Sequence, residues 1–114
     1  MDKKMVLFFV LEKIEMLDNV LLELNQSGIH GATIINTTGA AKTIISNEDD
    51  DTFSALRQFF NPARDENKTI FTVLPESKLP VAREAIERVV GDLSKPYTGI
   101  LFAFEAPYVA GIIE

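Results

Sequence analysis

The order of apolar and polar residues divides the chain into segments with strand-like and helix-like periods. Met5 to Leu11 is an unbroken apolar run, which has the length of a strand covered on both faces. Over about residues 14–26 the apolar side chains recur every three or four positions, which predicts an amphipathic helix. Ser27 and Gly28 end this helix, because glycine suits the left-handed position that often follows a helix.

The second half of the chain repeats the same order of elements after a long interruption. Further strands are expected at residues 31–37, 68–74 and 99–105. A second helix is expected between the last two of them, with Ser77 as its N-cap and Gly91 as its stop. Tyr108–Ile113 is a candidate for a short additional strand at the end of the chain.

This order predicts an α+β fold of the ferredoxin-like βαββαβ type. The four strands would form an antiparallel sheet with both helices on one face. Phe8 and Phe9 are neighbours in a strand, so their side chains point to opposite faces of the sheet. The face without helices is then too apolar to meet water, which predicts a partner, most simply further copies of the chain.

A long insertion, about residues 40–66, separates the second and third strands. Its middle is expected to form a short helix over Thr52–Phe60. The apolar side of that helix carries Phe53, Leu56, Phe59 and Phe60. This side is a candidate partner-docking surface, and it is equally consistent with packing against the body of the protein. The four carboxylates at 48–51 are typical of a solvated loop and lack the alternation of a calcium loop, so no metal site is predicted.

Composition narrows the class of protein further. A chain of 114 residues is expected to be one domain, residues 1–114. The net charge of −6 and the lack of a basic cluster argue against nucleic-acid binding. The chain has no cysteine and a single histidine, His30, so thiolate and multi-histidine metal sites are excluded. No apolar run approaches the roughly 20 residues of a membrane span, and a cytoplasmic protein without membrane insertion is expected.

Two short motifs carry a family resemblance. Leu17–Val20, with the sequence LDNV, stands at the first helix, and Gly31–Ile34, with the sequence GATI, opens the second strand. They are similar to the LDDV and GMTV motifs of the PII-like (nitrogen regulatory protein) superfamily, whose T-loop falls where the insertion lies here. The resemblance spans nearly the whole chain. It implies a homotrimeric signal-transduction protein that binds a small effector in intersubunit clefts and regulates a target protein through the insertion.

The loop before the fourth strand departs from the family pattern. Family members that bind ATP carry roughly Gly-Asp-Gly-Lys-Ile-Phe there, and backbone amides and the lysine hold the phosphates. Here Gly99 keeps its place, but Ile100 stands where the lysine is expected, and Lys95 comes earlier in the loop. The resemblance therefore implies a divergent member in which the standard ATP site is eroded. An adenine nucleotide remains one candidate effector.

The residues that the resemblance assigns to effector binding are Gly31, Ala32, Thr33, Gly39, Lys42, Lys95 and Gly99. The glycines are equally typical of ordinary turns, and the lysines of a solvated surface. The implied target is another protein, such as a membrane transporter or a metabolic enzyme. The alternative function is a ligand-free trimeric interaction module that docks through the insertion helix. An enzyme is not expected, because the strands offer few titratable residues and no nucleophile motif.

Overall fold

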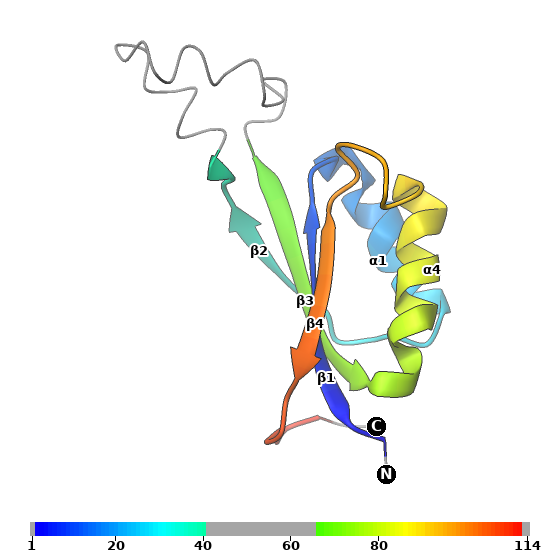
Figure 1. Cartoon of the computed structure of the whole chain (residues 1–114), viewed down its shortest axis with the longest axis vertical. Helices are drawn as coiled ribbons and strands as arrows, with labels where there is room; N and C mark the ends of the chain where they lie inside the picture. The colour runs from blue at the N-terminus through cyan, green and yellow to red at the C-terminus, as the bar shows by residue number, and fades with distance from the viewer. Residues whose placement is uncertain (1, 41–65, 113–114) are drawn as a thin grey trace.

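The computed structural model describes residues 2–40 and 66–112, which form two successive βαβ halves (Figure 1). The first half contains β1 (Lys4–Leu11), the 3-10 turn η1 (Ile14–Met16), α1 (Leu17–Gln26) and β2 (Thr33–Thr37). The second half contains β3 (Asn67–Pro75), the 3-10 turn η3 (Glu76–Lys78), α4 (Leu79–Val90) and β4 (Ile100–Glu105). Within these residues, neither helix has the length and apolar character that crossing a membrane requires.

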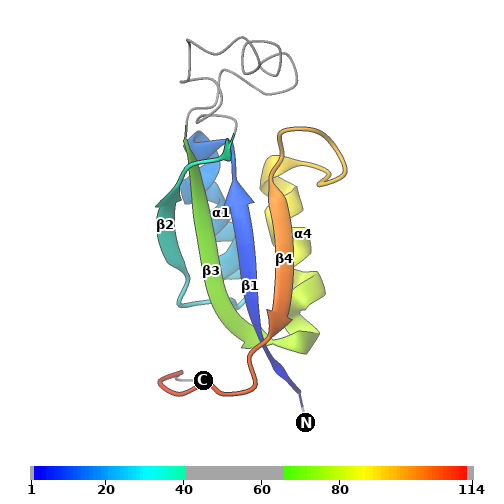
Figure 2. The ribbon, with the colours of Figure 1, turned by 60° about the vertical axis from the view of Figure 1, so that its left-hand side comes forward.

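The four strands form one antiparallel sheet in the order β2-β3-β1-β4 (Figure 2). β1 is central and pairs with β3 along its whole length, from Lys4 opposite Pro75 to Leu11 opposite Lys68. β4 pairs with the other side of β1, and β2 pairs with the first part of β3, so β2 and β4 are the two edges. Both helices lie on the same face of the sheet (Figures 1 and 2). The predicted ferredoxin-like βαββαβ fold is therefore confirmed.

The hydrophobic core lies between the sheet and its two helices, and we call this side of the sheet the covered face. Phe9 and Leu11 of β1 point into it, and their exposed fractions are 1% and 0%. The helices contribute Val20, Leu24, Ala82, Ala85, Ile86 and Val90. Small residues on α4 let that helix approach the sheet closely, while each large buried side chain contributes roughly 1.5–3 kcal/mol to folding.

The opposite side of the sheet, the open face, has no cover among the described residues. The register places Phe8 opposite Phe71 on β3 and opposite Phe102 on β4. The ring of Phe8 stacks on both, with centroid distances of 5.5 and 5.2 Å, and on Phe104 at 5.7 Å. We call these four residues the phenylalanine patch. Phe102 and Phe104 are 47% and 51% exposed, so the apolar second face predicted from the sequence is confirmed.

The start of α4 differs from the prediction. Ser77 does not cap the helix, because the 3-10 turn Glu76–Lys78 comes first and Lys78 occupies the N-cap position. Instead, the Ser77 hydroxyl and amide donate to the Asp2 carboxylate at 2.5 and 3.2 Å. The hydroxyl bond is the main reason that the pKa of Asp2 lies below its ordinary value. These bonds tie the start of the chain to the turn that follows β3.

The predicted strand at Tyr108–Ile113 is wrong for the residues that the structure describes, since 107–112 form no strand. The last bond beside β4 joins the amide of Ala106 to the carbonyl of Lys4 at 2.9 Å. Pro107 follows and has no amide proton to continue the ladder. The chain then turns across the lower end of the sheet (Figure 2).

Candidate functional site

Two of the predicted effector residues at the start of β2, Gly31 and Thr33, line a hollow at the lower end of the open face. Its volume is about 430 Å³, and its walls include Gly31, Thr33, Phe71, Val73 and Ile112. We call it the Thr33 hollow. Gly31 has φ +76 and open space around its Cα, so this position needs glycine for its backbone conformation. Ala32, the third member of this predicted set, is half-buried and packs against the core.

Three of the other predicted effector residues, Gly39, Lys95 and Gly99, lie at the opposite end of the sheet. Gly39 follows β2 at one edge, and its Cα lies near the Asn67 side chain. Lys95 and Gly99 belong to the loop before β4, at the other edge. Lys42 lies outside the described residues. The structure therefore keeps Gly39, Lys95 and Gly99 apart from Gly31, Ala32 and Thr33.

Gly99 is required by the way β4 packs on β1. Its φ is +130, and a Cβ atom there would lie 2.4 Å from the Val10 carbonyl oxygen and 2.6 Å from the Phe9 ring. No larger residue fits without moving the backbone of β1. The demand for glycine at this position thus comes from the fold itself. Ile100, the next residue, is 64% exposed.

Carboxylates of the chain itself already engage the amides of the loop between α4 and β4. Glu87 accepts a hydrogen bond from the amide of Leu93 at 3.0 Å. Asp92 accepts bonds from the amide and the hydroxyl of Ser94 at 2.9 and 2.8 Å, and these bonds hold the pKa of Asp92 below its ordinary value. The amide of Lys95 donates to the Asp92 carbonyl at 2.9 Å. Three successive amides therefore donate within the chain, two of them to carboxylates and the third to a backbone carbonyl.

The end of the same loop is fixed by Thr98, which is 4% exposed. Its hydroxyl donates to the Lys95 carbonyl at 3.0 Å. Tyr97 adopts φ +64, a conformation that costs a non-glycine residue energy and that needs surrounding structure to persist. The loop is thus held in one shape by its own hydrogen bonds.

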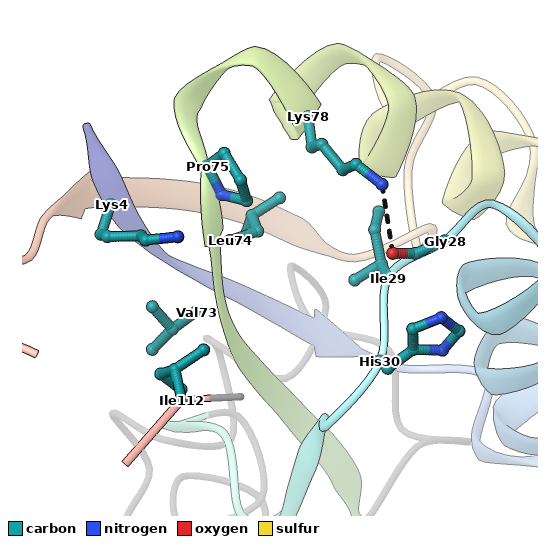
Figure 3. Close-up of a pocket in the computed structure, with 9 residues that line it drawn as sticks. All are labelled: Lys4, Gly28, Ile29, His30, Val73, Leu74, Pro75, Lys78 and Ile112. Carbon is teal, nitrogen blue, oxygen red and sulfur yellow. Dashed lines mark hydrogen bonds between the residues drawn. The ribbon is translucent and has the colours of Figure 1, made fainter. Parts of the chain in front are cut away.

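A second hollow, which the sequence did not predict, lies beside Lys78 (Figure 3). Its volume is about 370 Å³, and we call it the Lys78 hollow. Its lining residues are Lys4, Gly28, Ile29, His30, Val73, Leu74, Pro75, Lys78 and Ile112. The Lys78 ammonium donates to the Gly28 carbonyl at 3.2 Å. The His30 ring turns away from this hollow, and its Nδ1 lies 2.5 Å from Oδ1 of Asn25.

No sequence signal marks the Lys78 hollow, because its walls come from five separate segments of the chain. Only the pairing of Lys4 with Pro75 and the return of the chain at Ile112 bring them together. The predicted partner-binding residues Phe53, Leu56, Phe59 and Phe60 lie outside the described residues. Among the residues that are described, no three histidine or carboxylate side chains gather as a metal site would require.

Comparison with known proteins identifies the fold. No family model and no curated protein matches the sequence. Among solved structures, Arabidopsis thaliana PII bound to citrate superposes with a TM-score of 0.63 at 13% identity, covering 92% of this chain and 78% of that one. The B. subtilis GlnK-ATP complex gives 0.59 at 15% identity, covering 92% and 83%. A protein of unknown function from Pediococcus pentosaceus gives 0.61 at 13% identity, covering 98% and 99%. The chain has the fold of PII proteins at low sequence identity.

Proposed function

We propose that this chain is a cytoplasmic, non-enzymatic PII-like regulatory protein, one domain over residues 1–114. In this proposal it forms a homotrimer, binds a small effector between subunits and regulates a target protein. The observation that carries it is the open face with its phenylalanine patch. Soluble proteins rarely leave a contiguous apolar face in water, and copies of the same chain are its simplest cover.

The position of the Thr33 hollow supports an effector site between subunits. Thr33 lies opposite Phe71 in the β2–β3 register, on the face that carries the phenylalanine patch. Val73 is two residues further along β3 and shares that face. A second copy that covered the open face would therefore roof the Thr33 hollow and convert it into an enclosed cleft, the usual form of a small-molecule site.

The chemistry of the candidate site argues against the triphosphate of ATP. The amides of Leu93, Ser94 and Lys95 already donate to acceptors of this chain. Ile100 supplies no cation where the family resemblance implies a lysine. The residues present therefore do not fit ATP held through this loop. An effector with an adenine and no triphosphate remains compatible with the Thr33 hollow.

Target regulation is assigned to the insertion that contains Phe53, Leu56, Phe59 and Phe60. An effector that binds better to one conformation of the insertion favours that conformation and changes target affinity accordingly. The target is another protein, with a membrane transporter or a metabolic enzyme as the candidate classes.

Light scattering tests the trimer. We expect about three times the 12.7 kDa monomer mass at micromolar concentration. Phe104→Asp should give a folded monomer, since it places a charge in the contact between copies. Leu22→Asp, on an exposed position of α1, is the matched control and should keep the trimer. A wild-type protein that stays monomeric at micromolar concentration would contradict both the proposed trimer and the proposed cleft between subunits.

Calorimetry tests the effector site with adenosine, AMP and ATP as probes. We expect ATP to bind no more tightly than adenosine, because a missing charge-assisted contact costs about 10- to 150-fold in affinity. Thr33→Val, which keeps the shape and removes the hydroxyl, should weaken adenosine binding. Micromolar, magnesium-dependent ATP binding would contradict our interpretation of the loop.

The second candidate function is the ligand-free trimeric interaction module. The amides of Leu93, Ser94 and Lys95 favour it, because each already donates to an acceptor of this chain and not to a ligand. A trimer that binds none of the three probes would support this candidate. Deleting residues 44–64 and closing the gap with a short glycine linker then tests the insertion. The variant should remain a trimer and lose the partners that the intact protein captures, whereas unfolding would place the insertion in the core.

A further inference from the structure

The lower part of β3 has no neighbouring strand on the side where β2 lies. Thr33, the first residue of β2, is opposite Phe71, whereas β3 continues to Pro75. Residues 72–75 therefore border a gap in the sheet. The Thr33 hollow and the Lys78 hollow both lie along this gap, and they share three lining residues, His30, Val73 and Ile112. The two hollows are neighbouring parts of one gap.

The backbone N–H and C=O groups of Val73 face this gap. In an antiparallel sheet, the backbone groups of successive residues point to opposite neighbours. The Glu76 amide donates to the Lys3 carbonyl on the β1 side at 2.8 Å, so the groups of Val73, three residues earlier, point to the side where β2 would lie. Within the described residues, no hydrogen bond engages them there. An unpaired donor and acceptor at a strand edge favour the addition of an extended segment.

The segment that follows β4 leads into the same gap, and we call Pro107–Ile112 the strap. The Ala106 amide makes the last hydrogen bond beside β4, and within the part of the chain that the structure describes the strap itself makes none. Gly111 and Ile112 line the Thr33 hollow, and Ile112 lies beside Val73 (Figure 3). Ile112 is 47% exposed. The strap thus stands next to the free edge of β3 without pairing with it.

The residue types of the strap suit a strand. Residues 108–112 are tyrosine, valine, alanine, glycine and isoleucine, and three of these types favour extended structure. Gly111 has φ +87 and no atom within 4 Å of an added Cβ, so the backbone can change direction at this point. A segment without hydrogen bonds to its surroundings moves at little cost in free energy. The strap can therefore approach β3 while β4, which ends at Glu105, stays in place.

We propose that the strap closes onto the free edge of β3 as a short added strand and thereby occupies the Thr33 hollow. This inference rests on the proposed effector site. Closure pairs the backbone groups of Val73 and buries the exposed part of Ile112 against the wall of the hollow. An effector has to displace the strap, so its apparent affinity is reduced by the fraction of molecules in which the strap is open. The strap is thus an internal competitor of the effector.

Hydrogen exchange at the Val73 amide tests closure without any effector. We expect this amide to exchange about tenfold more slowly in the full-length wild type than in Ile112→Ser, which removes the apolar anchor of the strap. Tyr108→Ser is the matched control, because Tyr108 lies in the same strap, is 88% exposed and does not line the hollow. The Phe71 amide, which lies beside β2, should exchange equally in all three proteins. Equal exchange of the Val73 amide in the wild type and Ile112→Ser, or parallel loss of protection at Phe71, would overturn the proposal.

Calorimetry with adenosine measures the competition. We expect Ile112→Ser to bind adenosine about tenfold more tightly than the wild type, and Tyr108→Ser to bind it as the wild type does. Both measurements report one equilibrium, so the gain in affinity should match the loss of protection at Val73. Equal or weaker binding by Ile112→Ser would overturn the proposal and leave the proposed effector site intact. If none of the three proteins binds adenosine while the strap still protects Val73, the result would contradict the proposed effector and support closure of the strap.

Discussion

The two faces of the sheet are made by the same alternation of apolar residues, yet only one of them is covered by the chain itself. Phe9 on the covered face is 1% exposed, whereas Phe102 on the open face is 47% exposed. Phe8, next to Phe9 in β1, stacks on the other rings of the phenylalanine patch. Neighbouring residues in one strand therefore belong to two different environments, because their side chains leave the sheet in opposite directions.

This difference separates folding from association. The covered face buries its side chains under α1 and α4 and stabilises a single chain. The open face can gain comparable burial only from a second molecule, so its contribution depends on protein concentration. Truncating a phenylalanine on the covered face should therefore lower the stability of the single chain, whereas truncating one on the open face should weaken association.

The largest effect is expected on the covered face. Phe9→Ala removes a fully buried ring and leaves a cavity, which should lower the free energy of unfolding by about 3–5 kcal/mol. Urea denaturation at two protein concentrations measures it. The loss should be equal at both concentrations, because Phe9 packs within its own chain. A loss that grew with dilution would mean that the covered face also contributes to association, and the contrast between the faces would fail.

The same truncation on the open face should act on association. Phe102→Ala is expected to weaken the contact between copies by about 2 kcal/mol or more, the size of a central interface residue. The monomer should lose only the stacking of Phe102 on Phe8, which is far less than the loss in Phe9→Ala. Sedimentation across a dilution series measures this change. Leu22→Ala, 54% exposed on α1, is the control and should shift neither association nor unfolding. If Phe102→Ala destabilised the isolated chain as much as Phe9→Ala, the open face would be part of the fold rather than a contact.

The sheet and helices were predictable from the sequence because their signal is local. The run from Met5 to Leu11 and the helical spacing between residues 14 and 26 are each carried by consecutive residues. Of the two errors, one was caused by a residue far away in the sequence and the other by a neighbouring proline. Serine is a residue type that often caps helices, but the Ser77 hydroxyl donates a hydrogen bond to Asp2, which is far away in the sequence. The C-terminal segment has strand-like residues, but Pro107 interrupts the ladder beside Lys4.

The candidate sites were predictable only in part, because several of their residues are brought together by contacts between segments that are far apart in the sequence. Gly31 and Thr33 stand in a recognisable motif at the start of a strand, and the structure sets both in one hollow. The Leu93 amide donates to Glu87, which lies six residues earlier, and no sequence motif predicts that hydrogen bond. The Lys78 hollow has no sequence signal at all, since Lys4 and Ile112 meet only through the topology of the sheet.

Two glycine-to-alanine variants test how closely the residue before β4 packs against Phe9 of the covered face. Gly99→Ala places a methyl group 2.4 Å from the Val10 carbonyl and beside the Phe9 ring, and we expect a loss of about 2–3 kcal/mol in the free energy of unfolding. Gly91→Ala is the comparison variant: its φ of +91 with ψ of −173 also favours glycine, but no atom lies within 4 Å of an added Cβ, so any loss comes from the backbone conformation alone and should be smaller. Thermal denaturation of both variants compares them. Equal losses would mean that φ alone, and not the contact with Phe9, requires glycine at position 99.

The smallest effect concerns pH, and it again distinguishes folding from association. Hydrogen bonds from Ser77 stabilise the ionised Asp2 carboxylate and lower its pKa below the ordinary value of 3.8. A lowered pKa in the folded state adds stability above 3.8, and that stability is lost as the pH falls through the lowered value. Asp2→Asn should therefore be less stable than the wild type at neutral pH.

The difference between the two proteins should shrink as the pH falls below 3.8 and vanish once Asp2 is protonated in the folded state as well. Urea denaturation across this range measures it, with Glu84→Gln, on an exposed position of α4, as the control. The phenylalanine patch carries no titratable side chain, so Asp2→Asn should leave the association constant unchanged at every pH. A difference that persisted at the lowest pH would show that the carboxylate charge is not its source. A change in association would link the N-terminal tie to the open face and weaken the separation drawn between the two faces.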